Sequence, residues 1–190
     1  PQSLYLSEEA LIQHGPYAKC NPPLRTRAEV DAMWRFVQDG TVDTIGSDHS
    51  PFTAEEKEKG LENIFNAPSG FPGLETRLPL MLTAMKEGRI TLAQVVNLLS
   101  TNPSRIFGLY PRKGTIKIGA DADLALVNLD EPFTLHHSNM LTKSRDASRV
   151  YDGWKLYGRV LKTFVRGKLV FDEGRIVAEP GWGQWVTPGE

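Results

Sequence analysis

The chain has 190 residues, of which 40% are hydrophobic, and its 22 basic and 23 acidic residues leave a formal net charge of -1. This composition is typical of a globular protein and excludes a disordered or fibrous one. The balanced charge argues against nucleic acid and anionic membranes as partners, because both attract basic surfaces. We therefore expect a small neutral or zwitterionic ligand.

The cysteine content and the absence of long apolar stretches indicate in which cellular compartment the protein is expected. Cys20 is the single cysteine, so an intrachain disulfide framework is excluded and a reducing compartment, the cytoplasm, is predicted. No apolar stretch approaches the roughly 20 residues that a membrane-spanning helix needs, and we expect neither a signal peptide nor a membrane anchor. The sequence starts at Pro1 without a methionine, which suggests a segment of a longer protein.

The first fifty residues are predicted to alternate between strands and helices. Residues 4–6 resemble the end of a buried strand, Ser7 is placed to cap a short helix, and residues 17–20 are a possible second strand. Over residues 26–39, apolar side chains recur at the 3.6-residue spacing of a helix. Residues 42–46 are predicted to form a strand, and this order implies parallel neighbours joined by a right-handed crossover.

The middle of the chain is predicted to combine a long loop with helices. Residues 51–72 form the loop, which we interpret as a functional lid because long loops in compact domains often have that role. The mixed-charge run at 55–59 within it is predicted to be solvated helix surface. Apolar spacing and a threonine cap then predict helices over 74–87 and 91–100, and Asn102 begins another short one.

From Gly114 the pattern changes to short strands separated by glycine turns, so we place a domain boundary near residue 112. The predicted strands cover residues 122–128, 160–166 and 169–171, followed by a hairpin over 172–177.

Asp48, within Gly46-Ser47-Asp48-His49-Ser50-Pro51, is the main candidate for a functional residue. It directly follows the predicted strand 42–46, and in a β/α barrel the carboxyl ends of the strands carry the catalytic groups. A carboxylate there can ligate a divalent metal and move a proton during hydrolysis. The alternative is that Asp48 only caps the turn through its own backbone. His49 beside it can orient the carboxylate or the substrate, or it is a solvent-facing or core histidine.

Three other chemically capable groups are predicted to be structural. His136 and His137 are adjacent, so their side chains point to opposite faces of a strand and are not expected to converge on one metal ion. Cys20 lacks a second cysteine or a positioned base and is interpreted as a small buried hydrophobe. The sequence also contains no glycine-rich phosphate loop, so nucleotide chemistry is not supported.

Six short motifs, spread over nearly the whole chain, occur in an order that resembles the cyclic amidohydrolases, the dihydroorotase, allantoinase and hydantoinase group of the amidohydrolase superfamily. The motifs are Pro1-Gln2 with Leu4-Tyr5-Leu6, Lys19-Cys20-Asn21-Pro22-Pro23-Leu24-Arg25, Ser47-Asp48-His49-Ser50-Pro51, Gly73-Leu74-Glu75-Thr76, Asn102-Pro103-Ser104-Arg105-Ile106-Phe107-Gly108 and Gly119-Ala120-Asp121-Ala122-Asp123-Leu124.

The resemblance implies an α/β fold and an enzyme that opens cyclic amides. Residues 1–112 would be the C-terminal portion of a (β/α)8 TIM barrel, and residues 113–190 part of a small β-sandwich domain with the C-terminal tail. Members of this group cleave a ring C–N bond with a metal-activated hydroxide, hold two divalent metals, usually zinc, and usually form homo-oligomers. Asp48 matches the aspartate that ends the last barrel strand, binds one metal and handles the proton.

The other metal ligands of the family have no counterpart in this chain. The paired histidines, the bridging carboxylated lysine and two later histidines would all precede Pro1. A zinc ion needs about three to four protein ligands, and one is recognisable here. We therefore expect an inactive fragment that does not retain the metals without the N-terminal part of the barrel. The alternative hypothesis is a non-catalytic relative in which the fold serves as a scaffold or assembly module.

Substrate contacts are also implied by the resemblance. Asn21, Ser69 and Gly70 match positions at which family members contact the ring substrate, largely through backbone groups, and we include His49 with them. The alternative is plain loop structure, because asparagine, serine and glycine are common turn formers.

The motifs do not select one substrate within the group. Related dihydroorotases have Asp-His-Ala-Pro-His, whose final histidine contacts the substrate carboxylate, and Phe52 stands at that position here. This argues against a dihydroorotase and resembles a hydantoinase, whereas Asn21 is dihydroorotase-like and Ser47-Asp48-His49-Ser50-Pro51 is allantoinase-like. A hydantoin-like, allantoin-like or dihydropyrimidine-like ring remains open.

Overall fold

The computed structural model describes residues 1–189, and helices form the regular structure up to Ile106. The last helix of this part is continuous through α6, η3 and α7, where η3 is a π-helical stretch. The helices are α1 (Gln2–Tyr5), α2 (Glu8–His14), η1 (Gly15–Ala18), α3 (Arg27–Gln38), α4 (Ala54–Glu58), η2 (Ile64–Asn66), α5 (Leu74–Lys86), α6 (Leu92–Val96), η3 (Asn97–Thr101) and α7 (Asn102–Ile106).

Strands follow in the second part of the chain. Those of the larger sheet lie where the sequence predicts strands, whereas the strands at 133–134 and 155–156 were not predicted. A four-stranded antiparallel sheet has the order β1-β4-β5-β6, and β2 pairs with β3 in a separate ribbon. The β5–β6 pair is the predicted hairpin. The elements are β1 (Leu124–Asn128), β2 (Phe133–Thr134), η4 (His137–Asn139), η5 (Arg145–Ala147), β3 (Lys155–Leu156), β4 (Arg159–Val165), β5 (Lys168–Asp172) and β6 (Arg175–Ile176).

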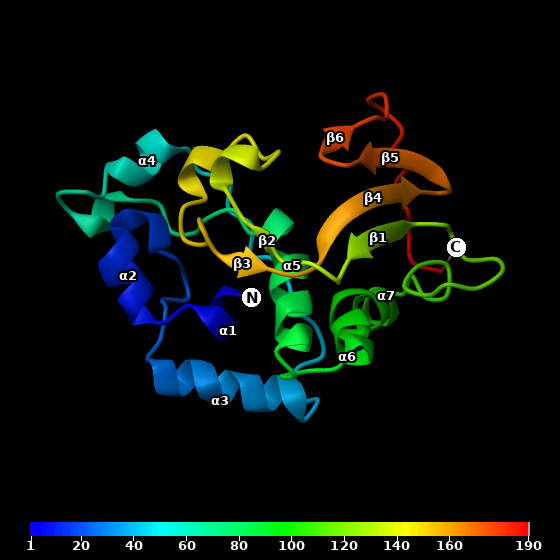
Figure 1. Cartoon of the computed structure of the whole chain (residues 1–190), viewed down its shortest axis with the longest axis horizontal. Helices are drawn as coiled ribbons and strands as arrows, with labels where there is room; N and C mark the ends of the chain where they lie inside the picture. The colour runs from blue at the N-terminus through cyan, green and yellow to red at the C-terminus, as the bar shows by residue number, and fades with distance from the viewer. Residues whose placement is uncertain (190) are drawn as a thin grey trace.

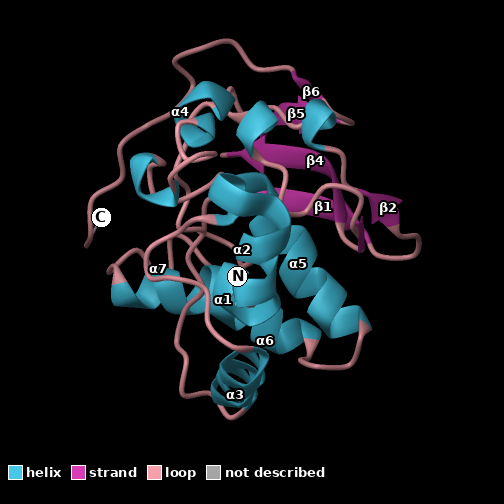
Figure 2. Cartoon of the chain, turned by 90° about the vertical axis from the view of Figure 1, so that its left-hand side faces the viewer, coloured by secondary structure: helices cyan, strands magenta, loops and turns pink. Residues whose placement is uncertain are grey.

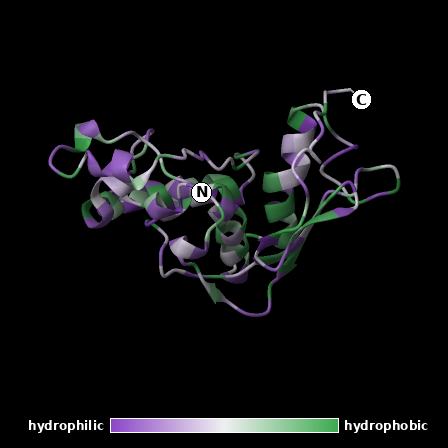
Figure 3. Ribbon diagram, turned by 90° about the horizontal axis from the view of Figure 1, so that it is seen from above, coloured by the Kyte–Doolittle hydropathy of each residue, from purple (hydrophilic) through white to green (hydrophobic). Residues whose placement is uncertain are grey.

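Helix α5 lies at the centre of the molecule. The N-terminal helices lie on one side of it, and the four-stranded sheet lies on the other side together with α6 and α7 (Figures 1 and 2). Figure 1 shows α4 and the β4–β5 turn on opposite sides of α5, and Figure 3 shows the molecule from above. Hydrophobic and hydrophilic residues alternate along the α6–η3–α7 helix in that view, as expected for a helix with one buried face.

Two long helices form where the sequence predicts them. Thr26 caps α3 in a capping box, in which its Oγ1 accepts from the Glu29 backbone N–H and its own N–H donates to the Glu29 carboxylate. Val30, Trp34 and Val37 form the buried stripe of α3. Helix α5 begins and ends within one residue of the predicted bounds.

Three predicted strands are absent from the described part of the chain, residues 1–189. Residues 4–6 overlap the helical turn α1, closed by the Leu4 N–H to Pro1 oxygen bond at 2.8 Å, and residues 17–20 overlap η1. Residues 42–46 are irregular, and the Ile45 N–H donates to the Leu98 carbonyl rather than to a strand. A strand needs a neighbour for its backbone groups, whereas a helical turn satisfies its own, so apolar runs without a neighbour do not form strands.

The core consists of two clusters of buried residues that share Tyr5 at their boundary. One lies between α1, α3, α5 and the α6–η3 helix, where Trp34 Nε1 donates to the Leu4 carbonyl at 2.6 Å. The other includes Cys20, Phe71 and Tyr151. Cys20 is buried with the apolar side chains, which confirms its interpretation as a small hydrophobe. Among the helices of residues 1–189, none is long and apolar enough to cross a membrane.

Candidate functional site

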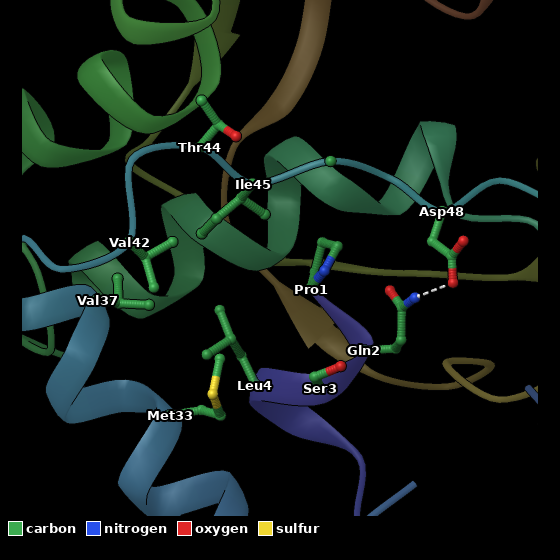
Figure 4. Close-up of a pocket in the computed structure, with 11 residues that line it drawn as sticks. Pro1, Gln2, Ser3, Leu4, Met33, Val37, Val42, Thr44, Ile45 and Asp48 are labelled. Atoms are coloured by element: carbon green, nitrogen blue, oxygen red, sulfur yellow. Dashed lines mark hydrogen bonds between the residues drawn. The ribbon is translucent and has the colours of Figure 1, made fainter. Parts of the chain in front are cut away.

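Asp48 lies at one end of an open hollow of about 440 Å³. Its side chain is exposed, and Oδ2 accepts a 2.8 Å hydrogen bond from Gln2 Nε2 (Figure 4). Its backbone has a φ of 49°, in the left-handed region that a non-glycine residue rarely adopts. The opposite end of the hollow is apolar and includes Met33, Val37 and Val42. The carboxylate therefore stands at a polar rim beside an apolar wall.

His49 faces the start of α5 rather than Asp48. Its Nδ1 accepts backbone N–H groups from Gly73 at 3.1 Å and from Leu74 at 3.4 Å. Because a backbone N–H can only donate, Nδ1 carries no proton, and the neutral ring carries its proton on Nε2. The Nδ1 contacts therefore hold the His49 ring with Nε2–H as its donor.

The segments around Asp48 and Gly70 lie side by side. His49 and Phe71 form a parallel bridge, and the Ser50 N–H donates to the Phe71 carbonyl at 3.2 Å. The approach is so close that a Cβ on Gly70 would lie 2.4 Å from Ser50 Oγ. Only a glycine fits there, and its φ of +121° also favours glycine.

A third segment, which carries Asn21, joins these two. The Gly70 N–H donates to the Lys19 carbonyl at 2.9 Å, and Asn21 follows two residues later with an exposed side chain. Ser69 is exposed next to Gly70. The structure therefore brings the segments of all the candidate residues together, while no hydrogen bond within residues 1–189 links their side chains to one another. The residues in question are Asn21, Asp48, His49, Ser69 and Gly70.

Lys57 is a residue whose place the sequence does not reveal. The charge run 55–59 is predicted to be solvated, but the Lys57 side chain is 0% exposed, so the prediction is wrong for this residue. Burial lowers the pKa of Lys57 to about 8. A run of mixed charges does not distinguish an inward lysine from outward ones. Gln2 belongs to a motif that resembles the family, but its contact with Asp48 was not predicted.

The side chains present do not make a complete metal site. Within residues 1–189, no group of three or more histidine, cysteine, aspartate or glutamate side chains is arranged to hold an ion. Asp48 contributes one carboxylate, whose neighbour Gln2 is a neutral amide.

His136 and His137 both lie near the Asp152 carboxylate. His137 Nδ1 lies 2.9 Å from Asp152 Oδ1, and His136 Nδ1 lies 4.0 Å from the same oxygen. The backbone N–H of His137 also donates to this carboxylate and is the main reason that the pKa of Asp152 is lowered. These contacts have the character of a local structural network.

The sequence profile of the Amidohydrolase family matches residues 5–170, which is most of the chain. The chain belongs to the amidohydrolase family. The resemblance expected from the six motifs is thereby confirmed. Two relatives show what share of a family member's length this amidohydrolase chain covers.

The L-hydantoinase of Paenarthrobacter aurescens is 37% identical over 188 residues, which cover 98% of this chain and 41% of the relative. The dihydroorotase of Geobacter sp. (strain M21) is 37% identical over 174 residues, covering 92% of this chain and 39% of the relative. The amidohydrolase chain therefore spans about two fifths of the length of these curated relatives.

Solved structures agree with this assignment. The L-hydantoinase (dihydropyrimidinase) from Arthrobacter aurescens matches 98% of this chain with a TM-score of 0.92 at 37% identity, and 41% of that protein is covered. The dihydropyrimidinase from Brevibacillus agri NCHU1002 matches 99% of this chain with a TM-score of 0.92 at 30% identity, again over 41% of its length. The chain thus has the fold of the corresponding part of these amidohydrolases.

Proposed function

We propose that this chain is part of a hydrolase that opens cyclic amides by cleaving a ring C–N bond. The observation that carries the proposal is the exposed Asp48 carboxylate at the junction of the three candidate segments. Relatives named hydantoinase and dihydroorotase, which match along nearly the whole chain, support the same class of reaction.

Each candidate group has a role that its chemistry allows. The Asp48 carboxylate takes a proton from the attacking nucleophile and returns it to the leaving ring nitrogen. The His49 Nε2–H is oriented by its Nδ1 contacts and can donate to a carbonyl oxygen. The backbone groups of Asn21 and Ser69, together with the second lone pair of the Gly70 carbonyl, suit a cyclic amide, because such a ring presents alternating N–H donors and carbonyl acceptors.

The remainder of the site and fold is proposed to lie in a longer protein. Asp48 would be one ligand of a metal pair, most simply two zinc ions, whose other ligands are outside this chain. Residues 42–46 would become a barrel strand once neighbouring strands are present, with barrel structure over 1–112 and sandwich structure over 113–190. That full-length protein would be a cytoplasmic homo-oligomer.

Phe52 bears on the substrate. Its ring lies 3.7 Å from the position that a Cβ on Gly70 would occupy, so it borders the proposed ring-binding segment. An aromatic side chain there offers no positive charge to a substrate carboxylate. We therefore propose uncharged rings such as hydantoin or dihydrouracil as substrates in preference to dihydroorotate.

The test is a hydrolysis screen of the full-length protein against hydantoin, allantoin, dihydrouracil and dihydroorotate. Asp48→Asn should lower kcat by a factor of about 100 or more, because it removes the proton acceptor while asparagine tolerates the left-handed backbone. Asp43→Asn is the matched control, since Asp43 is also exposed and near the same segment.

Two outcomes would contradict the proposal. Wild-type turnover in Asp48→Asn, with metal content confirmed, would remove Asp48 from the mechanism. A metal-loaded wild-type protein that opens none of the four rings would instead favour the scaffold alternative.

A further inference from the structure

Lys57 is buried without a carboxylate partner in the part of the chain that the structure describes. Its Nζ donates instead to three backbone carbonyls, those of Lys19 at 3.1 Å, Pro68 at 2.9 Å and Gly70 at 2.8 Å. An ammonium group has three N–H donors, so each donor has one acceptor. Burying an ammonium is costly unless it is hydrogen-bonded in this way, so the three carbonyls are needed for Lys57 to remain inside.

Lys19 holds the preceding stretch of the same loop. Its Nζ donates to the carbonyls of Ile64 at 2.8 Å, Phe65 at 3.3 Å and Ala67 at 2.6 Å. Its own carbonyl accepts both the Lys57 ammonium and the Gly70 N–H. The two lysines are therefore linked through one carbonyl.

The loop from residue 64 to residue 70 depends on these contacts because it has little structure of its own. Its regular structure is the single turn η2, in which the Ile64 carbonyl also accepts the Ala67 N–H, and lysine ammonium groups bond the carbonyls of Phe65, Ala67, Pro68 and Gly70. Lys57 binds the carbonyls on both sides of Ser69, namely those of Pro68 and Gly70. The lysine contacts thus determine where the Ser69 and Gly70 backbone lies relative to the segment carrying Asn21.

We propose that Lys19 and Lys57 are positioning residues that hold the 64–70 loop in the conformation that binds the substrate ring. This inference rests on the proposed function, because Ser69 and Gly70 are substrate contacts only there. Neither ammonium touches Asp48, so the pair acts on substrate affinity and not on proton transfer. Arginine cannot replace Lys57, because its planar fork does not direct three donors at three separate carbonyls.

The test compares Lys57→Met and Lys19→Met with Lys59→Met in the full-length protein. Methionine keeps much of the apolar stem and removes the ammonium, and Lys59 is an exposed lysine on the same segment. Both test variants should raise KM about tenfold while kcat changes by less than about threefold. Lys59→Met should leave both constants unchanged. In the double variant Lys19→Met/Lys57→Met, KM should rise by less than the product of the two single increases, because both lysines hold one loop.

Amide hydrogen exchange provides a readout that does not need activity. The Gly70 N–H should exchange faster in both test variants, whereas the Val30 N–H in α3, bonded to Thr26, should not change. If Lys57→Met does not fold, Lys19→Met carries the test, since Lys19 is only half-buried.

The outcomes separate this inference from the proposed function. Unchanged Gly70 exchange, or a fall in kcat with KM unchanged, would overturn the positioning role. If the wild-type protein opens no cyclic amide, the proposed function fails, and loop exchange alone then decides whether the lysines hold residues 64–70.

Discussion

At the scale of single residues, the backbone of Asp48 is as informative as its carboxylate. A φ of 49° costs an ordinary L-residue about 1–2 kcal/mol, while aspartate, asparagine and glycine tolerate it better. The left-handed turn places the Asp48 side chain at the rim of the hollow and directs the next residue, His49, toward α5. The side chains of Asp48 and His49, although adjacent in sequence, therefore face different surroundings.

This geometry predicts an unusual order of stabilities. Asp48→Gly should be more stable than Asp48→Ala by about 1 kcal/mol, because glycine adopts a positive φ without strain. Both variants lack the carboxylate, so the comparison isolates the backbone. The measurement is the free energy of unfolding of each variant in denaturant.

Asp43 provides the control for this order. Its φ is not positive, so Asp43→Gly should be less stable than Asp43→Ala. An alanine variant at position 48 that equals or exceeds the glycine variant would show that the left-handed turn is not a constraint.

Candidate site residues could be proposed from sequence only where a residue lies in a recognisable local pattern. Asp48 stands after an apolar run, Asn21 lies in a motif that resembles the family, and Ser69 and Gly70 match positions at which family members contact the substrate. Lys57 was not predictable, because its burial depends on carbonyls from residues 19, 68 and 70, which no local pattern brings together.

At the scale of elements, the long helices were predictable, whereas the three strands predicted in the N-terminal part are absent from residues 1–189. The backbone hydrogen bonds of α3 and its capping box lie within residues 26–39, so the local sequence is enough to predict this helix. Residues 42–46 have an equally apolar pattern, but a strand is completed by a neighbour elsewhere in the fold. The β1–β4–β5–β6 sheet was predictable because its later strands are joined by short turns.

The capping box of α3 gives a test at this scale. Thr26→Ala should lower the free energy of unfolding by about 1 kcal/mol, because the Glu29 N–H loses its acceptor. Thr26→Ser is the matched control, since serine keeps the hydroxyl that accepts from the Glu29 N–H and should retain most of the stability. Equal stabilities of the two variants would show that the cap does not contribute.

The same cap has a pH dependence with a definite sign. Hydrogen bonds from the Thr26 side chain and backbone lower the pKa of Glu29 in the folded chain. The contribution is therefore complete above the usual pKa of a glutamate and is lost as the pH falls through the lowered pKa. The difference between wild type and Thr26→Ala should narrow in acid.

At the scale of the whole molecule, α5 connects the helical part to the strands. The Glu75 carboxylate accepts the backbone N–H groups of Leu141 and Thr142 near one end of the helix. Near the other end, the Tyr157 N–H donates to Thr83 Oγ1 at 2.9 Å. Such long-range contacts arise only after the chain folds, which is why the sequence indicated a boundary near residue 112 but not how the two parts meet.

Gly158 is a point of close contact at this junction. With a φ of +84°, it packs so tightly on α5 that a Cβ would lie 2.3 Å from Leu82 Cδ1 and 2.8 Å from Leu82 Cβ. Gly153 has a similar φ of +79°, but nothing lies within 4 Å of its Cβ position. Comparing alanine variants at these two glycines therefore distinguishes backbone strain, which both share, from steric overlap, which occurs only at Gly158.

Gly153→Ala should destabilise the protein by about 1–2 kcal/mol through backbone strain alone. Gly158→Ala should cost about 1–3 kcal/mol more, because Leu82 or the β3–β4 connection must move. Combining Gly158→Ala with Leu82→Ala should cost less than the sum of the single changes, since the smaller side chain makes room. Denaturant unfolding of the four variants measures these terms, and strictly additive losses would mean that α5 and the β3–β4 connection are not in close contact in solution.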